Sequence, residues 1–170
     1  QPITPASLPQ PNAMSSTDGS RGALDVIGNE ILLQLGMTAA QQVQFLAEME
    51  RIVPWSRLEA AIAPSYPSSG RVGRPPIGVP KMLRMYCLQQ WYGLADEALE
   101  DALYDSQSMR DFVGIDLSRE SVPDATTLLK FRRLLLANDL TKTLFDEINA
   151  HLAEKGLLMR SGTIVDATII

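Results

Sequence analysis

A lone carboxylate within a run of strand-forming residues most constrains what this chain can fold into. The run occupies residues 161–170 and reads Ser-Gly-Thr-Ile-Val-Asp-Ala-Thr-Ile-Ile, with Asp166 near its centre. Threonine, valine and isoleucine favour strands, but a strand needs neighbouring strands for its backbone hydrogen bonds. The preceding residues have helix or loop patterns and supply none. We therefore expect a mainly α protein with an orphan C-terminal strand, as at the front of a larger protein cut where a second domain begins.

The composition narrows the class of protein. A length of 170 residues, with 45% hydrophobic and 21% charged residues, is typical of a soluble globular domain with a tail. The single Cys87 excludes an intramolecular disulfide and a cysteine-based zinc site, and its apolar helical surroundings predict a buried thiol. No apolar run approaches the roughly 20 residues that cross a bilayer, and no signal-peptide pattern is present. We expect a cytoplasmic protein without membrane contact.

The net charge of −5 is unevenly distributed along the chain. Residues 51–90 carry six bases and one acid, a net +5, whereas residues 91–116 carry one base and seven acids, a net −6. Residues 117–136 are again basic, with a net +2. Because a binding surface responds to the local charge, the acidic total does not exclude a nucleic-acid partner.

The chain divides into a polar extension and a helical region. Residues 1–37 begin with a proline-rich stretch, followed by a short apolar piece at 23–35 that Gly36 ends. This composition predicts a disordered or weakly helical extension. Helix start and stop signals follow throughout residues 38–158, and among them are a capping box at 38–41, Pro80 in a first turn and Gly93 after a last turn. The predicted helices run from 38 to Pro54, 55–62, 81–92, from an Asp96 cap onward, 125–137, and from 140 to Gly156.

The predicted helix 125–137 has two distinct faces. Thr126, Lys130 and Arg133 lie at i, i+4 and i+7, and therefore share one face. Leu128, Phe131 and Leu135 occupy the opposite face. An apolar back with a short cationic front is what a major-groove recognition helix needs, and the preceding acid-capped helix would complete a helix-turn-helix-like unit. The alternative is an ordinary amphipathic helix with a solvated cationic face.

A second cationic strip precedes this helix. Arg71 and Arg74 stand in a glycine- and proline-rich linker, whose slim, extended backbone suits entry into a minor groove or contact with phosphates. Lys81 and Arg84 extend the strip one turn further on, and several phosphate contacts would make the affinity salt-dependent. The alternative is a surface linker whose arginines serve solubility.

Asp166 is the one residue where metal chemistry is predicted. A carboxylate among isoleucine and valine is costly to bury unless it is paired or bound to a metal. Phosphoryl-transfer sites use several such carboxylates to hold Mg²⁺, and one carboxylate does not suffice. The alternative is a strand-end aspartate that accepts hydrogen bonds from a turn. His151 has no partner ligand in the sequence and predicts no metal site.

Seven stretches carry a resemblance to a known family. They are Arg-Ile-Val-Pro-Trp at 51–55, Arg-Pro-Pro-Ile-Gly at 74–78, Leu-Arg-Met-Tyr at 83–86, Leu-Gln-Gln-Trp-Tyr-Gly-Leu at 88–94, Asp-Glu-Ala-Leu-Glu-Asp-Ala-Leu-Tyr-Asp-Ser at 96–106, Pro-Asp-Ala-Thr-Thr through Phe-Arg-Arg-Leu at 123–134, and Gly-Thr-Ile-Val-Asp-Ala-Thr at 162–168. From about Phe45 to its end, the chain resembles the N-terminal part of bacterial insertion-sequence transposases of the insertion sequence five group. Residues 1–40 do not match, and Ser65 and Ala95 replace residues that are common in that family.

The resemblance implies different functions for two parts of the chain. Residues 38–158 would form a helical DNA-binding domain that reads the terminal inverted repeats of the element as double-stranded DNA. Residues 159–170 would be the first strand of a ribonuclease-H-like catalytic core with an Asp-Asp-Glu triad that binds Mg²⁺. Asp166 matches the first acid of that triad, and the other two would follow beyond Ile170. We therefore expect neither catalysis nor a metal cofactor in this chain alone.

Three functional hypotheses follow. The first is a binding module that holds transposon-end DNA through Arg71, Arg74, Lys81, Arg84, Thr126, Lys130 and Arg133. The second is an active transposase, for which Glu147 and Glu154 are the nearest further acids, although nothing in their spacing supports them. The third is an interaction fragment without DNA, in which the acidic block 91–116 and the last helix form a homodimer or pair with full-length transposase and lower its activity.

Overall fold

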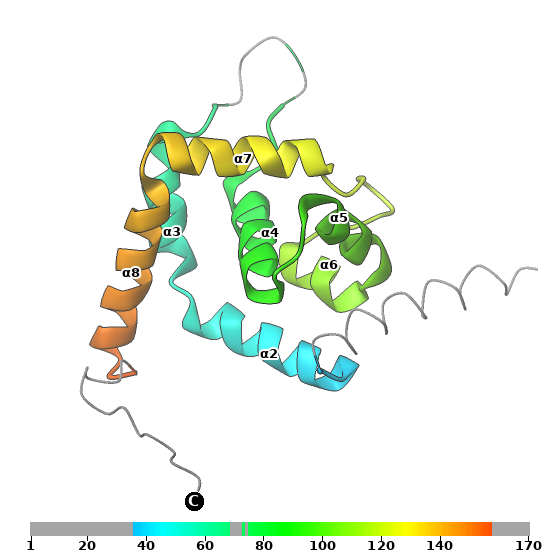
Figure 1. Ribbon diagram of the computed structural model, residues 1–170, viewed down its shortest axis with the longest axis horizontal. Helices are drawn as coiled ribbons and strands as arrows, with labels where there is room; N and C mark the ends of the chain where they lie inside the picture. Colours follow the sequence, from blue (N-terminus) through cyan, green and yellow to red (C-terminus); the bar gives the residue numbers. More distant parts are fainter. Residues whose placement is uncertain (1–35, 69–72, 74, 158–170) are drawn as a thin grey trace, which may run out of the picture.

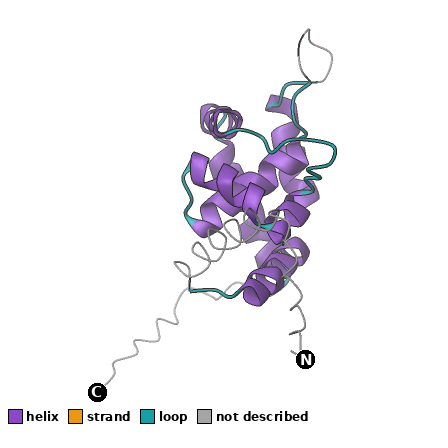
Figure 2. Ribbon diagram, turned by 90° about the vertical axis from the view of Figure 1, so that its right-hand side faces the viewer, coloured by secondary structure: helices purple, strands orange, loops and turns teal. Residues whose placement is uncertain are grey.

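The computed structural model describes residues 36–68, 73 and 75–157, and all of its regular structure is helical (Figure 1). The elements are α2 (Ala39–Ile52), α3 (Trp55–Ile62), the 3₁₀ turn η1 (Ala63–Ser65), α4 (Val79–Tyr92), α5 (Asp96–Asp105), α6 (Gln107–Val113), α7 (Ala125–Ala137) and α8 (Leu140–Glu154). Figure 2 shows only helices and loops in this part of the chain. The predicted mainly α fold is confirmed, and the predicted strand at Asp166 lies outside the described residues.

Helix α4 is the centre of the arrangement. It contacts α3, α5, α6 and α7, and in Figure 1 α7 crosses beside one end of it while α2 lies on the other side. Its side chains are buried around most of the circumference, including Met82, Leu83, Met85 and Leu88. A helix that is apolar on several sides must be enclosed, as the sequence predicted. Helix α8 packs along α3, at the edge of the bundle (Figure 1).

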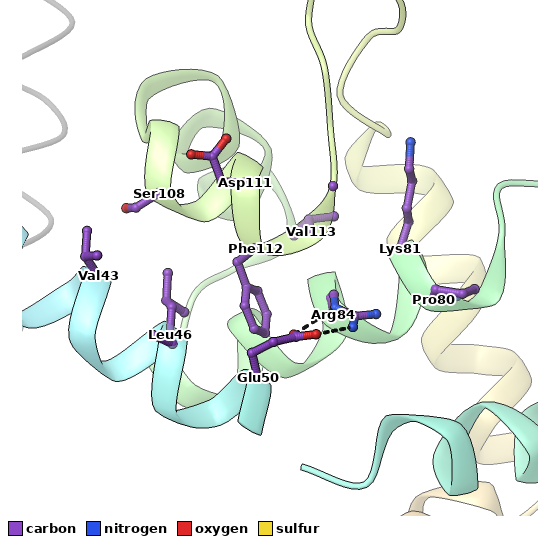
Figure 3. Close-up of a pocket in the computed structure, with 12 residues that line it drawn as sticks. Val43, Leu46, Glu50, Pro80, Lys81, Arg84, Ser108, Asp111, Phe112 and Val113 are labelled. Carbon is purple, nitrogen blue, oxygen red and sulfur yellow. Dashed lines mark hydrogen bonds and ion pairs between the residues drawn. The ribbon is translucent and has the colours of Figure 1, made fainter. Parts of the chain in front are cut away.

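Helices α2 and α6 pack against each other, and Phe45 of α2 contacts Trp91 and Tyr92 in the last turn of α4. An open groove of about 660 Å³ lies between these three elements (Figure 3). One wall is formed by α2 and the other by α6, with Val43 and Phe112 among the apolar side chains that line it. An ion pair between Glu50 and Arg84 crosses one end, with an N···O distance of 2.7 Å.

Several helix boundaries follow from predicted local signals. The Thr38 hydroxyl accepts a hydrogen bond from the Gln41 amide (3.2 Å), and the Gln41 side chain accepts one from the Thr38 amide (2.8 Å), which completes the capping box. Gly93 ends α4 in the left-handed region, with φ at 61°. This conformation costs glycine little, which explains why the helix stops there.

Two features of the region between α4 and α7 differ from the prediction. Helix α5 begins after Ala95 without a side-chain cap, because Ala95 has no acceptor and Asp96, the predicted cap, is the first helical residue, with its carboxylate bonded to Gln89 and Arg132. Helix α6 was not predicted, although Ser106 caps it and Gly114 follows its last residue. Because α6 and residues 114–124 separate α5 from α7, these two helices pack together without the short turn of a helix-turn-helix unit.

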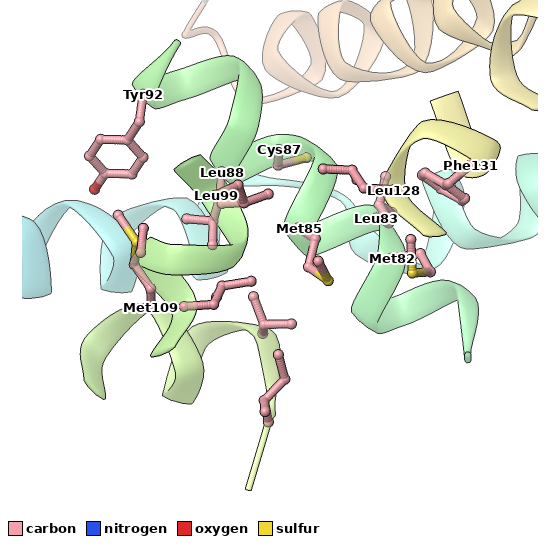
Figure 4. Packing of buried hydrophobic residues seen from close by; sticks show 14 of the residues in the cluster. Met82, Leu83, Met85, Cys87, Leu88, Tyr92, Leu99, Met109, Leu128 and Phe131 are labelled. Carbon is pink, nitrogen blue, oxygen red and sulfur yellow. The ribbon is translucent and has the colours of Figure 1, made fainter. Parts of the chain in front are cut away.

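One apolar cluster holds the described helices together (Figure 4). Leu88 and Leu99 are fully inaccessible to solvent, and the Phe45 ring meets the rings of Trp91 and Tyr92 edge-on, with centroids 5.6 and 5.9 Å apart. Such edge-to-face pairs add to the burial of apolar area. No helix of the described residues is long and apolar enough to cross a membrane.

Cys87 is buried in this cluster, and its environment predicts its reactivity. Burial raises the pKa of the Cys87 thiol to about 12, because the apolar surroundings disfavour the thiolate. Only the thiolate is nucleophilic, so the native protein should resist a thiol reagent at about pH 8, near the pKa of an unperturbed thiol. Absorbance of the released chromophore should show reaction only after denaturant is added. Rapid modification of the native protein would contradict this burial.

Candidate nucleic-acid interface

Helix α7 owes its orientation first to its apolar back. Leu128, Phe131 and Leu135 are buried, as the spacing predicted. The Phe131 ring lies between two tyrosines, with its centroid 6.0 Å from that of Tyr66 and 6.2 Å from that of Tyr86. The back of α7 is therefore attached both to α4 and to the segment that follows α3.

A polar contact fixes the rotation of α7 about its axis. The Arg132 guanidinium lies 3.0 Å from the Asp96 carboxylate, whose other oxygen accepts a hydrogen bond of 2.6 Å from the Gln89 amide. Gln89 is only 3% exposed, and its carbonyl oxygen in turn lies 3.5 Å from Arg132. Helices α4, α5 and α7 are thus joined by one charged pair and one buried amide. A charge-assisted bond of this kind is stronger than a neutral one.

Carboxylates from two elements occupy the first turn of α7. The Asp124 side chain accepts a hydrogen bond of 2.6 Å from the Thr127 amide, which confirms the predicted cap. The Glu100 carboxylate of α5 accepts one of 2.8 Å from the Ala125 amide. Free amide groups at a helix N-terminus attract anions, but here two acids already fill that place. A phosphate would therefore meet α7 through side chains further along it.

The front of α7 is exposed and cationic. Thr126, Lys130 and Arg133 are all solvent-exposed, and they lie on one face of the helix as predicted. Within the described part of the chain, Lys130 and Arg133 form no ion pair, whereas carboxylates neutralise most other cations. The paired ones are Arg57, Lys81, Arg84, Arg119, Arg132 and Lys142. An unneutralised pair of cations on one rigid face gives a locally positive surface on an acidic protein.

The structure pairs Lys81 and Arg84 with carboxylates of other segments, unlike Lys130 and Arg133. Lys81 pairs with Glu120. The Arg84 side chain is 16% exposed, between Glu50 at 2.7 Å and Glu59 at 3.6 Å, and its guanidinium carbon lies 4.4 Å from the centroid of the Trp55 ring. The sequence did not reveal these partners, because they come from helices distant along the chain.

The predicted linker residues Arg71 and Arg74 lie outside the described residues. The described residues on either side of that segment lie beside α7. The Tyr66 hydroxyl donates a hydrogen bond of 2.6 Å to the Ile77 carbonyl, and the Tyr66 ring contacts Phe131. Tyr66 and Ile77, which flank the segment that carries both arginines, therefore meet at the apolar back of α7, the face opposite Lys130 and Arg133.

Asp166, the predicted catalytic and metal-binding residue, also lies outside the described residues. In the described ranges, no group of three or more His, Cys, Asp or Glu side chains is placed to hold a metal ion. His151 is half-buried on α8. These described residues do not provide a site that fits Mg²⁺.

A protein-family comparison gives an independent result. The family described as Transposase domain (DUF772) matches residues 37–134, which is more than half of the chain and extends from α2 through most of α7. No solved structure matches the chain.

Replacing Asp96 tests how α7 is held. An Asp96→Ala change leaves the Arg132 charge and the buried Gln89 amide without their shared partner, so it should lower the free energy of unfolding by about 1–3 kcal/mol. Urea denaturation followed by circular dichroism measures this loss. The control is Asp146→Ala, which breaks a solvent-exposed pair with Lys142 and should change the free energy of unfolding little. Equal losses in the two variants would contradict a positioning role for Asp96.

Proposed function

The chain belongs to the Transposase domain (DUF772) family, and we propose that it acts in DNA transposition by binding the terminal inverted repeats of its element through α7. Family membership supports the role in transposition. The observation that carries the DNA-binding part is the exposed face of α7, where Lys130 and Arg133 have no carboxylate partner among the described residues. Phosphate contacts by such cations supply much of the affinity of DNA-binding proteins.

The dimensions of α7 suit a DNA groove. Thr126 and Arg133 are seven residues apart on the helix, or about 10 Å along its axis, and a major groove about 12 Å wide admits one helix. In this proposal Arg133 donates two hydrogen bonds to a guanine, because its planar fork matches that base edge. Lys130 contacts a phosphate as a point charge, and Thr126 contacts a base edge or its methyl group.

The linker arginines complete the proposed contact. We propose that Arg71 and Arg74 reach a minor groove or phosphates of the same duplex, because they lie in the sequence between Tyr66, which contacts Phe131 of α7, and Ile77, which is bonded to Tyr66. Arg84 has a different role in this proposal. Its contacts with Glu50, Glu59 and Trp55 join α2, α3 and α4, so it supports the fold on which α7 rests.

The finer assignment is to the insertion sequence five group, with Asp166 as the first acid of an Asp-Asp-Glu triad that uses Mg²⁺. It rests on the motif resemblance alone, above all on residues 162–168. We assign no catalytic step to this chain. In this proposal its contribution to transposition is recognition of the transposon end.

The DNA contact predicts a salt-dependent affinity that two substitutions reduce. Changing Lys130→Gln and Arg133→Gln together should weaken binding of an inverted-repeat duplex at least about tenfold. The slope of log Kobs against log salt concentration should become shallower by about 1, because Lys130 is the phosphate contact that the double substitution removes. Fluorescence anisotropy of labelled duplex, titrated with the 170-residue chain at several salt concentrations, measures both.

Lys155→Gln provides the matched control, because Lys155 is an exposed lysine at the end of α8 with no ion pair among the described residues. It should change the affinity little. A scrambled duplex of equal length tests recognition of the repeat. Absence of binding at low salt would contradict the proposal, and equal affinity for both duplexes would contradict recognition of the inverted repeat.

A second candidate function is self-association, or pairing with full-length transposase in a way that lowers its activity. Two large apolar side chains near the junction of α7 and α8 favour it. Leu136 is 67% exposed and Phe145 is 64% exposed, and both line one shallow surface hollow with Thr141 and Lys142. Exposed apolar patches of this kind mark protein contacts more often than isolated exposed leucines do.

Light scattering of the DNA-free chain tests self-association. A dimer would have twice the monomer mass of 18.6 kDa, and Phe145→Ser should restore the monomer by removing apolar contact area. A wild-type protein that stays monomeric as its concentration rises would rule out the homodimer. Coexpression with intact transposase would then test the heterologous pairing.

A further inference from the structure

We propose that residues 23–35 of this chain fill the groove between α2 and α6, folded back along α2 as the other arm of a helical hairpin. The proposal does not depend on DNA binding, because no residue of α7 lines this groove.

The groove presents an apolar surface that the described residues leave uncovered. Val43, Leu46, Ala47 and Glu50 follow each other on α2 at i, i+3, i+4 and i+7 and so form one continuous wall (Figure 3). Phe112 of α6 stands opposite, between that wall and the first turns of α4. Val43 is 55% exposed, although its neighbour Leu46 is only 4% exposed. A stripe at this spacing is what a helix presents to another helix.

The segment before α2 has a matching pattern. Residues 23–35 read Ala-Leu-Asp-Val-Ile-Gly-Asn-Glu-Ile-Leu-Leu-Gln-Leu. Leu24, Ile27, Ile31 and Leu35 recur at intervals of three, four and four, which is the spacing of one apolar face of an amphipathic helix. Asp25, Asn29 and Glu30 lie off that stripe. The sequence pattern therefore supplies an apolar face with no partner assigned to it.

The junction favours a reversal of direction. Gly36 has a φ of 65°, in the left-handed region that glycine commonly adopts just after a helix. Thr38 already caps α2, so only a few residues would separate the two arms. Helices joined by a loop of two to five residues form antiparallel hairpins.

The lengths also agree. Leu24 and Leu35 are eleven residues apart, or about 16 Å along a helix. Folded back from Gly36, that stripe would lie along α2 and reach Glu50 at the far end of the wall. The distance from the start of α2 to Glu50 is similar to the length of the stripe. The C-terminal segment is a poorer occupant, because it follows α8, which packs on α3 and is held there by the Arg57–Glu154 ion pair.

Hydrogen exchange of the full 170-residue chain, read by mass spectrometry, tests the hairpin. The amides of residues 24–35 should exchange at least about tenfold more slowly than those of an unstructured chain. A Val43→Asp change places a charge in the wall and should abolish this protection. Leu117→Asp is the matched control, because Leu117 is 44% exposed in the connection between α6 and α7, and it should leave the protection unchanged.

A variant on the segment itself and a control on the fold complete the experiment. Ile31→Asp should release the same protection from the other side of the contact, while amides of α4 stay protected in all variants and show that the fold is intact. Exchange of residues 24–35 at unstructured-chain rates in the wild type would overturn the proposal. So would protection that survives Val43→Asp. Protection that rises with protein concentration would overturn it too, because the segment would then be bound by a second copy.

Discussion

The enclosure of α4 is the constraint on which the other described helices depend. Helices α3, α5, α6 and α7 pack along it and α2 reaches it through side chains, because its apolar side chains point in too many directions for any one partner to cover. Each neighbour is held by its own contact: α2 by Phe45 against Trp91 and Tyr92, and α7 by Phe131 against Tyr86. The position of the candidate interface is therefore a consequence of core packing.

The adjacent residues Arg132 and Arg133 on α7 have different electrostatic environments. Successive residues on a helix differ in direction by about 100°, so Arg132 points to Asp96 and Gln89 while Arg133 points to solvent. The inner charge is neutralised and locks the rotation of the helix. The outer one, with Lys130, stays unneutralised among the described residues on a chain whose net charge is −5. This division leaves two unneutralised cations on the outer face of α7 in an acidic protein, and it supports DNA as the proposed partner.

Local sequence signals predicted much of the fold, and long-range contacts account for most of what they missed. The capping box at Thr38, the stop at Gly93 and the two faces of α7 were predictable because each depends on residues within two turns of a helix. The partners of Arg84 and Asp96 were not, since they lie on other helices. Helix α6 had usable signals in Ser106 and Gly114, but its seven residues are too few for periodicity to stand out. The roles of Arg71, Arg74 and Asp166 stay predictions, because these residues lie outside the described part of the chain.

The central claim is that the front of α7 is the surface that meets DNA. Backbone amide chemical shifts of the isotope-labelled chain, recorded as inverted-repeat duplex is added, test it most directly. The account predicts that the largest changes centre on Thr126, Lys130 and Arg133, with little change at the acidic residues of α5. Changes that centre on α2 or α5, with α7 unaffected, would contradict it.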